Sequence, residues 1–200
     1  QSKNQQNTLA QTLKNTWMHD INMVFKLISS DINILPMLKQ VVENWGDFKP
    51  IQISVQKETL RINLISGVPL PRIGNEENQT RFNNSNKTKK TKKYHKYTEC
   101  ICFLDWFEKI YGGKIHRVAI TYLPAGGKVH PHIDKGSYYE NKDRFHLVLS
   151  GYYDYIVDGE KQRFGAGDLF WFDNKKIHSS INVTPMPRIS LIFDAEGSII

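Results

Sequence analysis

Short apolar runs separated by turn residues fill the C-terminal half of the chain, and they limit the folds open to it. The runs are KIHRVAITYL, RFHLVLSG, YYDYIV, DLFWF, SSINV and RISLIFDA. They are rich in β-branched and aromatic residues, which favours strands, and Asp158 and Gly159 after YYDYIV form a typical hairpin signal. Because no helical pattern alternates with these runs, they indicate a jelly roll rather than a parallel α/β sheet.

Further elements are predicted upstream of these runs. Helical patterns cover three stretches: Leu9 to Met18, Ser30 or Asp31 to about Trp45, and Thr98 to Gly112. Strand patterns cover three more: MVFKLI at 23–28, IQISV at 51–55 and LRINLI at 60–65. Ser30 or Asp31 is the expected cap of the second helix, although Pro36 favours a later start. Thr98 is expected to cap the third helix.

The length suits one domain over residues 1–200. We expect a mainly β fold with a double-stranded β-helix (jelly-roll or cupin-like) core over residues 114–196, and with N-terminal and inserted helices packed outside it. The sequence has neither a long apolar run nor a signal-peptide pattern, so we expect no membrane insertion and a cytoplasmic location. Cys100 and Cys102 suit neither a mutual disulfide nor a zinc site, so both are expected to be reduced core residues.

One segment carries the net charge of the chain. Residues 74–98 are rich in Asn, Lys and Thr with little to bury, which predicts a mobile loop. The seven Lys and Arg residues between 81 and 98 have no acidic residue among them, and they match the net charge of +7 of the whole chain. The rest of the chain is therefore neutral overall, which argues against a nucleic-acid-binding surface. The segment is expected to be solvated, with electrostatic attraction of an acidic substrate as the functional alternative.

Two histidines and an aspartate form a candidate metal site. Residues two apart on a strand point to the same side, so His132 and Asp134 can reach one ion, and His178 supplies a second imidazole. Two imidazoles and one carboxylate can bind one face of a metal and leave the other face open, as in non-heme Fe(II) oxygenases. Zinc is the rival ion.

Polar residues on neighbouring strand patterns suggest an anion site beside the metal. Arg188 lies in the apolar run RISLIFD, where a buried guanidinium needs an anionic partner such as a dicarboxylate cosubstrate. Arg144 and His146 are two apart in RFHLVL, so both can face the same cavity, and Thr121 on ITYLP adds a hydroxyl.

Four of these motifs together resemble a known family. TYLPAGGKVHPH, RFHLVL, FDNKKIH and RISLIFD are similar in order and spacing to the aspartyl/asparaginyl β-hydroxylase family of 2-oxoglutarate-dependent Fe(II) dioxygenases, over about residues 117–196. The resemblance implies that His132 and His178 bind iron. Asp134 stands where the best-known animal members have glycine, so this chain has a complete triad of two histidines and one carboxylate.

The same resemblance implies how the cosubstrate is bound. Arg188 and Thr121 match the groups that hold the distal carboxylate of 2-oxoglutarate, and Arg144 and His146 match the pair near its C1 carboxylate. The implied reaction uses O2 and releases succinate and CO2 while an unactivated C–H bond becomes an alcohol. The full triad also leaves two kinds of substrate open, a free amino acid or a peptide Asp or Asn side chain.

Two other function classes are alternatives to this enzyme. One is a non-catalytic cupin-like module that binds a metal or a small acid, and the other is a nucleic-acid binder that uses the Lys-rich segment. Arg188 argues against the first, because a plain metal-binding barrel does not need a buried anion clamp. Few aromatic residues lie among the lysines, which argues against the second. The oligomeric state is left open.

Two residues near these motifs have competing interpretations. His130 shares the predicted strand phase of His132, but the family resemblance favours His132 as the ligand. Arg61 on LRINLI is expected to be a solvated strand residue, with contact to substrate as the alternative.

Overall fold

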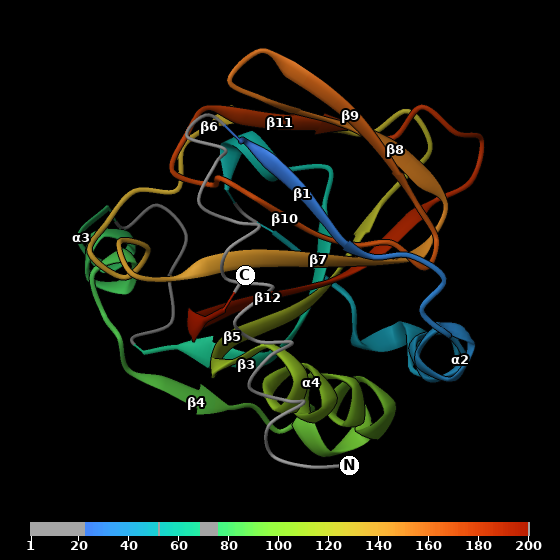
Figure 1. Cartoon of the computed structure of the whole chain (residues 1–200), viewed down its shortest axis with the longest axis horizontal. Coiled ribbons are helices and arrows are strands. Elements are labelled where there is room, and N and C mark those ends of the chain that lie inside the picture. Colours follow the sequence, from blue (N-terminus) through green and yellow to red (C-terminus); the bar gives the residue numbers. More distant parts are fainter. Residues whose placement is uncertain (1–22, 52, 69–75, 200) are drawn as a thin grey trace, which may run out of the picture.

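The computed structural model describes residues 23–51, 53–68 and 76–199, which form two facing antiparallel sheets (Figure 1). The strands of the larger sheet are β1 (Phe25–Ser29), β2 (Lys49–Pro50), β3 (Leu60–Gly67), β4 (Thr88–Lys90), β5 (Gly112–Leu123), β7 (Asp143–Ser150), β10 (Leu169–Phe172) and β12 (Arg188–Ser198). The strands of the smaller sheet are β6 (Lys128–His132), β8 (Tyr152–Val157), β9 (Glu160–Gly165) and β11 (His178–Ile181).

The strand order identifies the fold. Within the described residues the larger sheet runs β1-β10-β7-β12-β5-β3-β2, with β4 paired to β3, and the smaller sheet runs β6-β11-β8-β9. From β5 to β12 the chain crosses repeatedly between the two sheets, with only β8 and β9 consecutive in one of them. This winding is that of a double-stranded β-helix, so the predicted fold class is confirmed.

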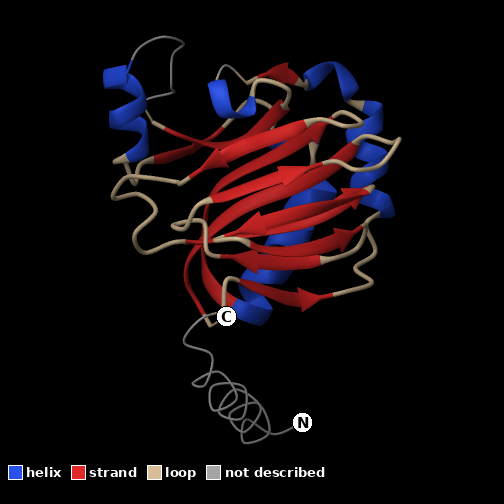
Figure 2. Ribbon diagram, turned by 90° about the horizontal axis from the view of Figure 1, so that it is seen from above, coloured by secondary structure: helices blue, strands red, loops and turns tan. Residues whose placement is uncertain are grey.

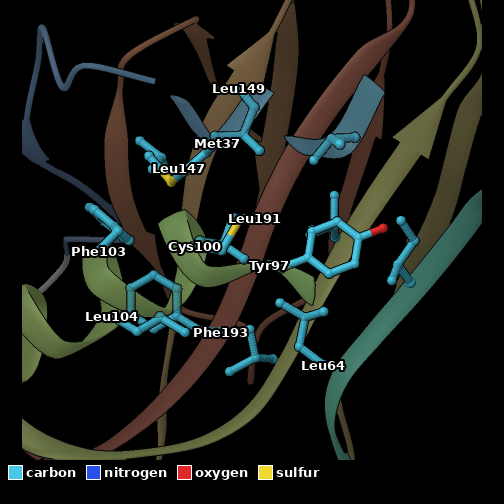
Figure 3. Close-up of a cluster of buried hydrophobic side chains, with 14 of the residues drawn as sticks. Met37, Leu64, Tyr97, Cys100, Phe103, Leu104, Leu147, Leu149, Leu191 and Phe193 are labelled. Atoms are coloured by element: carbon cyan, nitrogen blue, oxygen red, sulfur yellow. The ribbon is translucent and has the colours of Figure 1, made fainter. Parts of the chain in front are cut away.

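Two helices cover the outer face of the larger sheet. Helices α2 (Leu35–Glu43) and α4 (Thr98–Tyr111) lie on the side away from the smaller sheet (Figures 1 and 2). In the cluster that Figure 3 shows, Met37 and Phe103 of these helices join Leu147, Leu191 and Phe193 of the central strands. Each such buried side chain contributes about 1.5–3 kcal/mol, so this layer fixes the helices on the sheet. The inner face of the sheet is left for other contacts.

A second apolar cluster joins the two sheets at one end. Tyr153 and Tyr155 of β8 pack against Phe170 and Phe172 of β10, and Phe164 of β9 stacks on Phe170 with ring centroids 3.6 Å apart. The opposite end of the space between the sheets, the polar end, is lined by charged and polar residues together with apolar ones. The apolar end therefore holds the sheets together while the polar end stays open.

The predicted strand runs of the C-terminal half are all present. The hairpin between β8 and β9 turns at Asp158 and Gly159, with φ of 51° and 86°, as the sequence predicts. Gly112 ends α4 with a φ of 69°, which glycine adopts without strain.

Three predictions about the N-terminal half are wrong. No strand includes the described residues among 51–55: residues 54–56 form a 3-10 turn, and the short strand β2 pairs with β3 instead. Neither Ser30 nor Asp31 caps α2, because Pro36 lacks an N–H and is tolerated only in the first turn, where the helix begins. Thr98 does not cap α4 either: it is the first residue of the helix, Tyr97 holds the cap position, and the Thr98 hydroxyl accepts a hydrogen bond from Gln40. The helix predicted over residues 9–18 lies outside the described residues.

The Lys-rich segment has more structure than the loop predicted over residues 74–98. It contains α3 (Glu76–Asn83), β4 and a 3-10 turn at Tyr94–Lys96. Phe82 of α3 lies over the guanidinium of Arg117, 3.8 Å from ring centroid to Cζ, and β4 extends the edge of β3. Backbone pairing, this contact, ion pairs of Lys93 and Lys96 with Asp47 and the burial of Tyr97 in the core hold the segment in place. The mobility of the segment stays a prediction.

Two further observations concern surface and core. Both cysteines are free, but only Cys100 is in the core, whereas Cys102 is exposed and the expectation of a core position is wrong. No helix in the described ranges combines the length and apolar character needed to cross a membrane.

Candidate functional site

A pocket of about 570 Å³, lined by charged, polar and apolar residues, opens between the inner face of the larger sheet and strands β6 and β11. The residues that the sequence marked as candidates all line it: Thr121, His132, Asp134, Arg144, His146, His178 and Arg188. Alternation along the strands explains this convergence, because residues two apart share a face. Arg144 and His146 on β7 follow this rule.

The three candidate metal ligands lie together at one edge of the pocket. His132 ends β6 and is the register partner of His178, which begins β11, and their ring centroids are 4.2 Å apart. Asp134 follows two residues later, with its backbone N–H donating to the carbonyl oxygen of Asn174 at 3.1 Å. One ligand atom of each of the three residues lies within 4.8 Å of the others. Such a cluster can hold one metal ion.

Backbone carbonyls orient both imidazoles. Nδ1 of His132 lies 2.8 Å from the carbonyl oxygen of His130, and Nδ1 of His178 lies 2.9 Å from that of Lys176. A carbonyl only accepts, so each Nδ1 must carry the proton and the lone pair of each ring lies on Nε2. Burial lowers the pKa of His178 to about 4, although the charge of Asp134 opposes this. His178 is therefore neutral near pH 7 and able to bind a metal.

Arg144 and Asn174 fix the carboxylate of Asp134. Both donate to Oδ2, Asn174 at 2.9 Å, while Oδ1 lies 4.0 Å from Nε2 of His132. Burial alone would raise the pKa of Asp134, but the charge of Arg144 and the hydrogen bond from Asn174 outweigh it and lower the pKa. Asp134 is thus ionised near neutral pH, with one oxygen held by the protein and the other facing the histidines.

Arg144 also pairs with Asp194. Its Nε lies 2.8 Å from Oδ1 of Asp194 and its Nη2 lies 3.2 Å from Oδ2, and Tyr138 donates to the same carboxylate. The flanking carboxylates raise the pKa of Arg144 well above its ordinary value despite burial. Arg144 therefore links the candidate metal site to β12.

Arg188 is a buried cation of the pocket that has no salt bridge to an acidic residue among those described. It is 2% exposed, donates to Oγ of Ser180 at 3.3 Å and lies over the ring of Tyr153 at 4.1 Å. No carboxylate pairs with it among the described residues, and its buried Nε has no hydrogen-bond partner there. A buried guanidinium in this state has unused donors for a planar anion.

Thr121 and His146 flank this cation. Thr121 on β5 is the register partner of Ser190 on β12, two residues from Arg188, and its hydroxyl lies 3.5 Å from the Ser190 carbonyl oxygen. His146 lies in an aromatic enclosure with its Nδ1 3.2 Å from the hydroxyl of Tyr153. Burial, together with the charges of Arg188 and Arg144, lowers the pKa of His146 well below its ordinary value, so its ring is neutral.

The other described histidines lie apart from the triad. His130 is exposed, because an irregularity in the pairing of β6 with β11 matches Ser180 to Val129 and His178 to His132. The extra residue changes the strand phase, so the predicted shared phase of His130 and His132 is wrong. His116 is buried beside Glu196 outside the pocket.

One pocket residue, Gln56, has no counterpart among the predictions, and another, Arg61, was expected in solvent with contact to substrate only as the alternative. Arg61 on β3 lines the pocket, so its expected position as a solvated strand residue is wrong. Gln56, in the 3-10 turn Ser54–Gln56, lies between Arg61 and His132. The only sequence signal was the alternation in LRINLI, which groups Arg61 with Asn63 on one face but does not say what covers that face.

Comparisons with known proteins agree with the fold and the motifs. Residues 75–197 match the family model described as "Aspartyl/Asparaginyl beta-hydroxylase". No curated protein sequence matches the chain.

Similar solved structures are cupin and double-stranded β-helix proteins. The cupin domain of Cnp3 from Schizosaccharomyces pombe shows 14% identity and a TM-score of 0.35, over 40% of this chain and 55% of that chain. A predicted oxalate decarboxylase from Thermotoga maritima shows 16% identity and a TM-score of 0.43, over 76% of this chain and 95% of that chain. A double-stranded β-helix protein from Klebsiella pneumoniae shows 22% identity and a TM-score of 0.35, over 40% of this chain and 67% of that chain.

Proposed function

The chain belongs to the aspartyl/asparaginyl β-hydroxylase family, and on this basis we propose that it is a 2-oxoglutarate- and Fe(II)-dependent dioxygenase. Its substrate is an amino acid or a peptide Asp or Asn-type side chain, in which an unactivated C–H bond is hydroxylated with release of succinate and CO2. O2 is the second cosubstrate.

The observation that carries the proposal is the state of Arg188 beside the histidines and Asp134. Burying an unpaired guanidinium costs free energy of desolvation, and an anionic ligand that pairs with it would offset this cost. 2-Oxoglutarate has a carboxylate at each end and can reach from an arginine to a metal within one pocket. The distal carboxylate is assigned to Arg188 and Thr121.

The donor set fits Fe(II). His132 and His178 would each contribute Nε2 and Asp134 would contribute Oδ1, leaving open positions for other ligands. Bound Fe(II) supplies the O2 activation that couples 2-oxoglutarate decarboxylation to hydroxylation of the substrate. The contribution of the chain is orientation: fixed imidazole tautomers, an ionised carboxylate and a shielded pocket.

Arg144 and His146 are proposed to border the C1 carboxylate of the cosubstrate. The charge of Arg144 is already shared by two carboxylates, so its main task is to hold Asp134 in place. His146, neutral and enclosed, can exchange a hydrogen bond with the cosubstrate without introducing a second charge.

A screen for succinate tests the proposal. The protein is incubated with Fe(II), 2-oxoglutarate and O2, together with single amino acids or short peptides, and succinate is measured. Substrate-dependent succinate that disappears when Fe(II) is chelated is the expected result. Absence of any Fe(II)-dependent 2-oxoglutarate turnover, with calorimetry showing no binding of 2-oxoglutarate to the metal-loaded protein, would reject the proposal.

A further inference from the structure

Positively charged side chains outnumber acidic ones in the pocket. The acidic residues that line the described pocket are Asp134 and Asp194, and both pair with Arg144. Three further arginines line it: Arg61, Arg117 and Arg188. Each has a buried Nε without a hydrogen-bond partner among the residues that the structure describes.

Two of these three arginines already have a role. Arg188 is assigned to the cosubstrate by the proposed function. Arg117 holds α3 in place: its guanidinium lies between the rings of Phe82 and Tyr138, at 3.8 and 3.4 Å, and its Nη2 donates to the carbonyl oxygen of Phe82 at 2.6 Å. Arg61 remains without such a structural task.

The contacts of the Arg61 side chain place its guanidinium near the candidate metal site. Its strand β3 pairs with β5, with Thr121 as its register partner, so the side chain rises from the inner face of the larger sheet. Its Nη2 donates to Oε1 of Gln56 at 3.2 Å. Nε2 of the same Gln56 lies 3.3 Å from Nε2 of His132, the nitrogen proposed to bind metal. One side chain therefore lies between the guanidinium and this nitrogen, and its amide nitrogen must move away when a metal binds there, while its Oε1 can keep the bond to Arg61.

The local electrostatics of Arg61 are unfavourable in the absence of a ligand. Burial, together with the like charge of Arg144, lowers the pKa of Arg61, although the charges of Asp134 and Asp194 partly oppose this. A neutral residue at this strand position would satisfy the sheet equally well, since only the backbone takes part in pairing with Thr121. The cost of a partly buried, unpaired cation thus indicates an anionic partner that comes from outside the chain.

We infer that Arg61, oriented by Gln56, binds a carboxylate of the prime substrate beside the metal site, so that the enzyme prefers an acid to the matching amide. A planar guanidinium can donate two parallel hydrogen bonds to a carboxylate, whereas an amide offers one acceptor and no charge. The inference rests on the proposed function, but Arg61 and Gln56 precede residues 75–197, so the family match assigns them no role.

Binding of matched acids and amides tests the inference. The protein is loaded with Zn(II) in place of iron and saturated with 2-oxoglutarate, which occupies Arg188. Isothermal titration at fixed ionic strength then compares N-acetyl-L-asparagine amide with two acids, N-acetyl-L-aspartate amide and N-acetyl-L-asparagine. The first acid has a side-chain carboxylate and the second a main-chain carboxylate, so the preferred one identifies the source of the anion.

The wild type should bind one acid about tenfold to a hundredfold more tightly than the amide, and Arg61→Gln should lose that preference. Arg61→Lys, which keeps the charge but not the planar fork, should retain part of it. Lys135→Gln is the matched control, because this exposed lysine at the pocket also carries one positive charge. Its preference should stay within about twofold of the wild type.

The outcomes separate this inference from the proposed function. If the wild type binds 2-oxoglutarate but shows no preference for either acid, or if Arg61→Gln keeps the preference, the role of Arg61 is overturned. An equal loss in Lys135→Gln would also overturn it, since general electrostatic attraction would then suffice. Failure of the wild type to bind 2-oxoglutarate at all would instead reject the proposed function. Unchanged Zn(II) and 2-oxoglutarate binding by Arg61→Gln shows that the variant is folded.

Discussion

At the scale of single residues, backbone carbonyls decide which nitrogen of each candidate histidine is free. Because both Nδ1 atoms are held by carbonyls two residues upstream, the metal-binding face is set before any ion arrives. Carbonyls and carboxylates in this position also raise the basicity of the ligating nitrogen. The two imidazoles differ in burial, however: His178 is enclosed beside Phe172, whereas His132 is partly accessible.

Removing either imidazole should abolish Fe(II)-dependent turnover. We expect His132→Ala and His178→Ala to weaken metal binding by more than about a hundredfold, because changes to groups that only support a ligand already cost about 10–100-fold. His178→Ala should also lower thermal stability more than His132→Ala, since it empties a buried site. Calorimetric Fe(II) titration under argon and thermal unfolding measure the two effects. Undiminished metal binding in both variants would contradict the assignment.

Arg188→Ala should weaken 2-oxoglutarate selectively. Charge-assisted hydrogen bonds contribute about 1.5–3 kcal/mol, so the apparent KM for 2-oxoglutarate should rise about tenfold to a hundredfold while Fe(II) affinity is unchanged. Thr121→Ala removes a neutral contact and should have a smaller effect in the same direction. Steady-state kinetics with varied 2-oxoglutarate provide the measurement. A rise in the KM of the prime substrate alone would assign the clamp to the substrate instead.

At the scale of elements, the sequence predicts where strands lie but not which part of the protein packs on each face of a strand. Alternation in LRINLI correctly predicts β3 and separates Ile62 and Leu64 from Arg61. A polar strand face usually meets solvent, but here the smaller sheet and its loops cover it, so Arg61 lies in a pocket. The irregular pairing of β6 likewise turns the side chain of His130 to the opposite face of the strand, and the sequence gives no signal of it. The choice of His132 over His130 as the candidate ligand is unaffected, because it rests on the spacing of the family motif and not on strand phase.

The Lys-rich segment is an edge element whose exposed charges should be dispensable for cosubstrate binding. Lys87, Lys89, Lys90 and Lys92 are exposed, whereas Lys93 and Lys96 pair with Asp47 and are left unchanged. Replacing the four exposed lysines by serine should leave basal 2-oxoglutarate decarboxylation within about twofold and stability within about 0.5 kcal/mol. Assays of succinate without prime substrate, and denaturant unfolding, provide the check. A collapse of basal decarboxylation would make this segment part of the cosubstrate pocket.

At the scale of the whole molecule, the fold divides its two tasks between the faces of one sheet. The outer face packs on α2 and α4 and supplies stability, while the inner face holds charged groups at the polar end of the space between the sheets. Arginines, histidines and aspartates are therefore enclosed in a protein whose apolar layers must offset their desolvation. This arrangement makes stability dependent on pH.

Stability of the metal-free protein should fall on mild acidification. The ordinary pKa of histidine is 6.5. Burial lowers the pKa of His146 well below this value and that of His178 to about 4. Below pH 6.5 the unfolded chain therefore binds protons at these histidines, whereas the folded protein does not. The free energy of unfolding thus decreases as the pH falls toward the pKa values of the folded protein. Each histidine should cost about 1 kcal/mol between pH 7 and pH 5.5, and denaturant unfolding in the presence of a chelator measures the sum. His146→Gln should reduce that decrease by about 1 kcal/mol, with His178 and the buried His116, whose pKa is also lowered by burial, contributing the rest. His95→Gln, at an exposed position, should leave the decrease unchanged. A decrease that begins only below about pH 4.5 would show that both buried histidines take up protons in the folded protein as readily as in the unfolded chain.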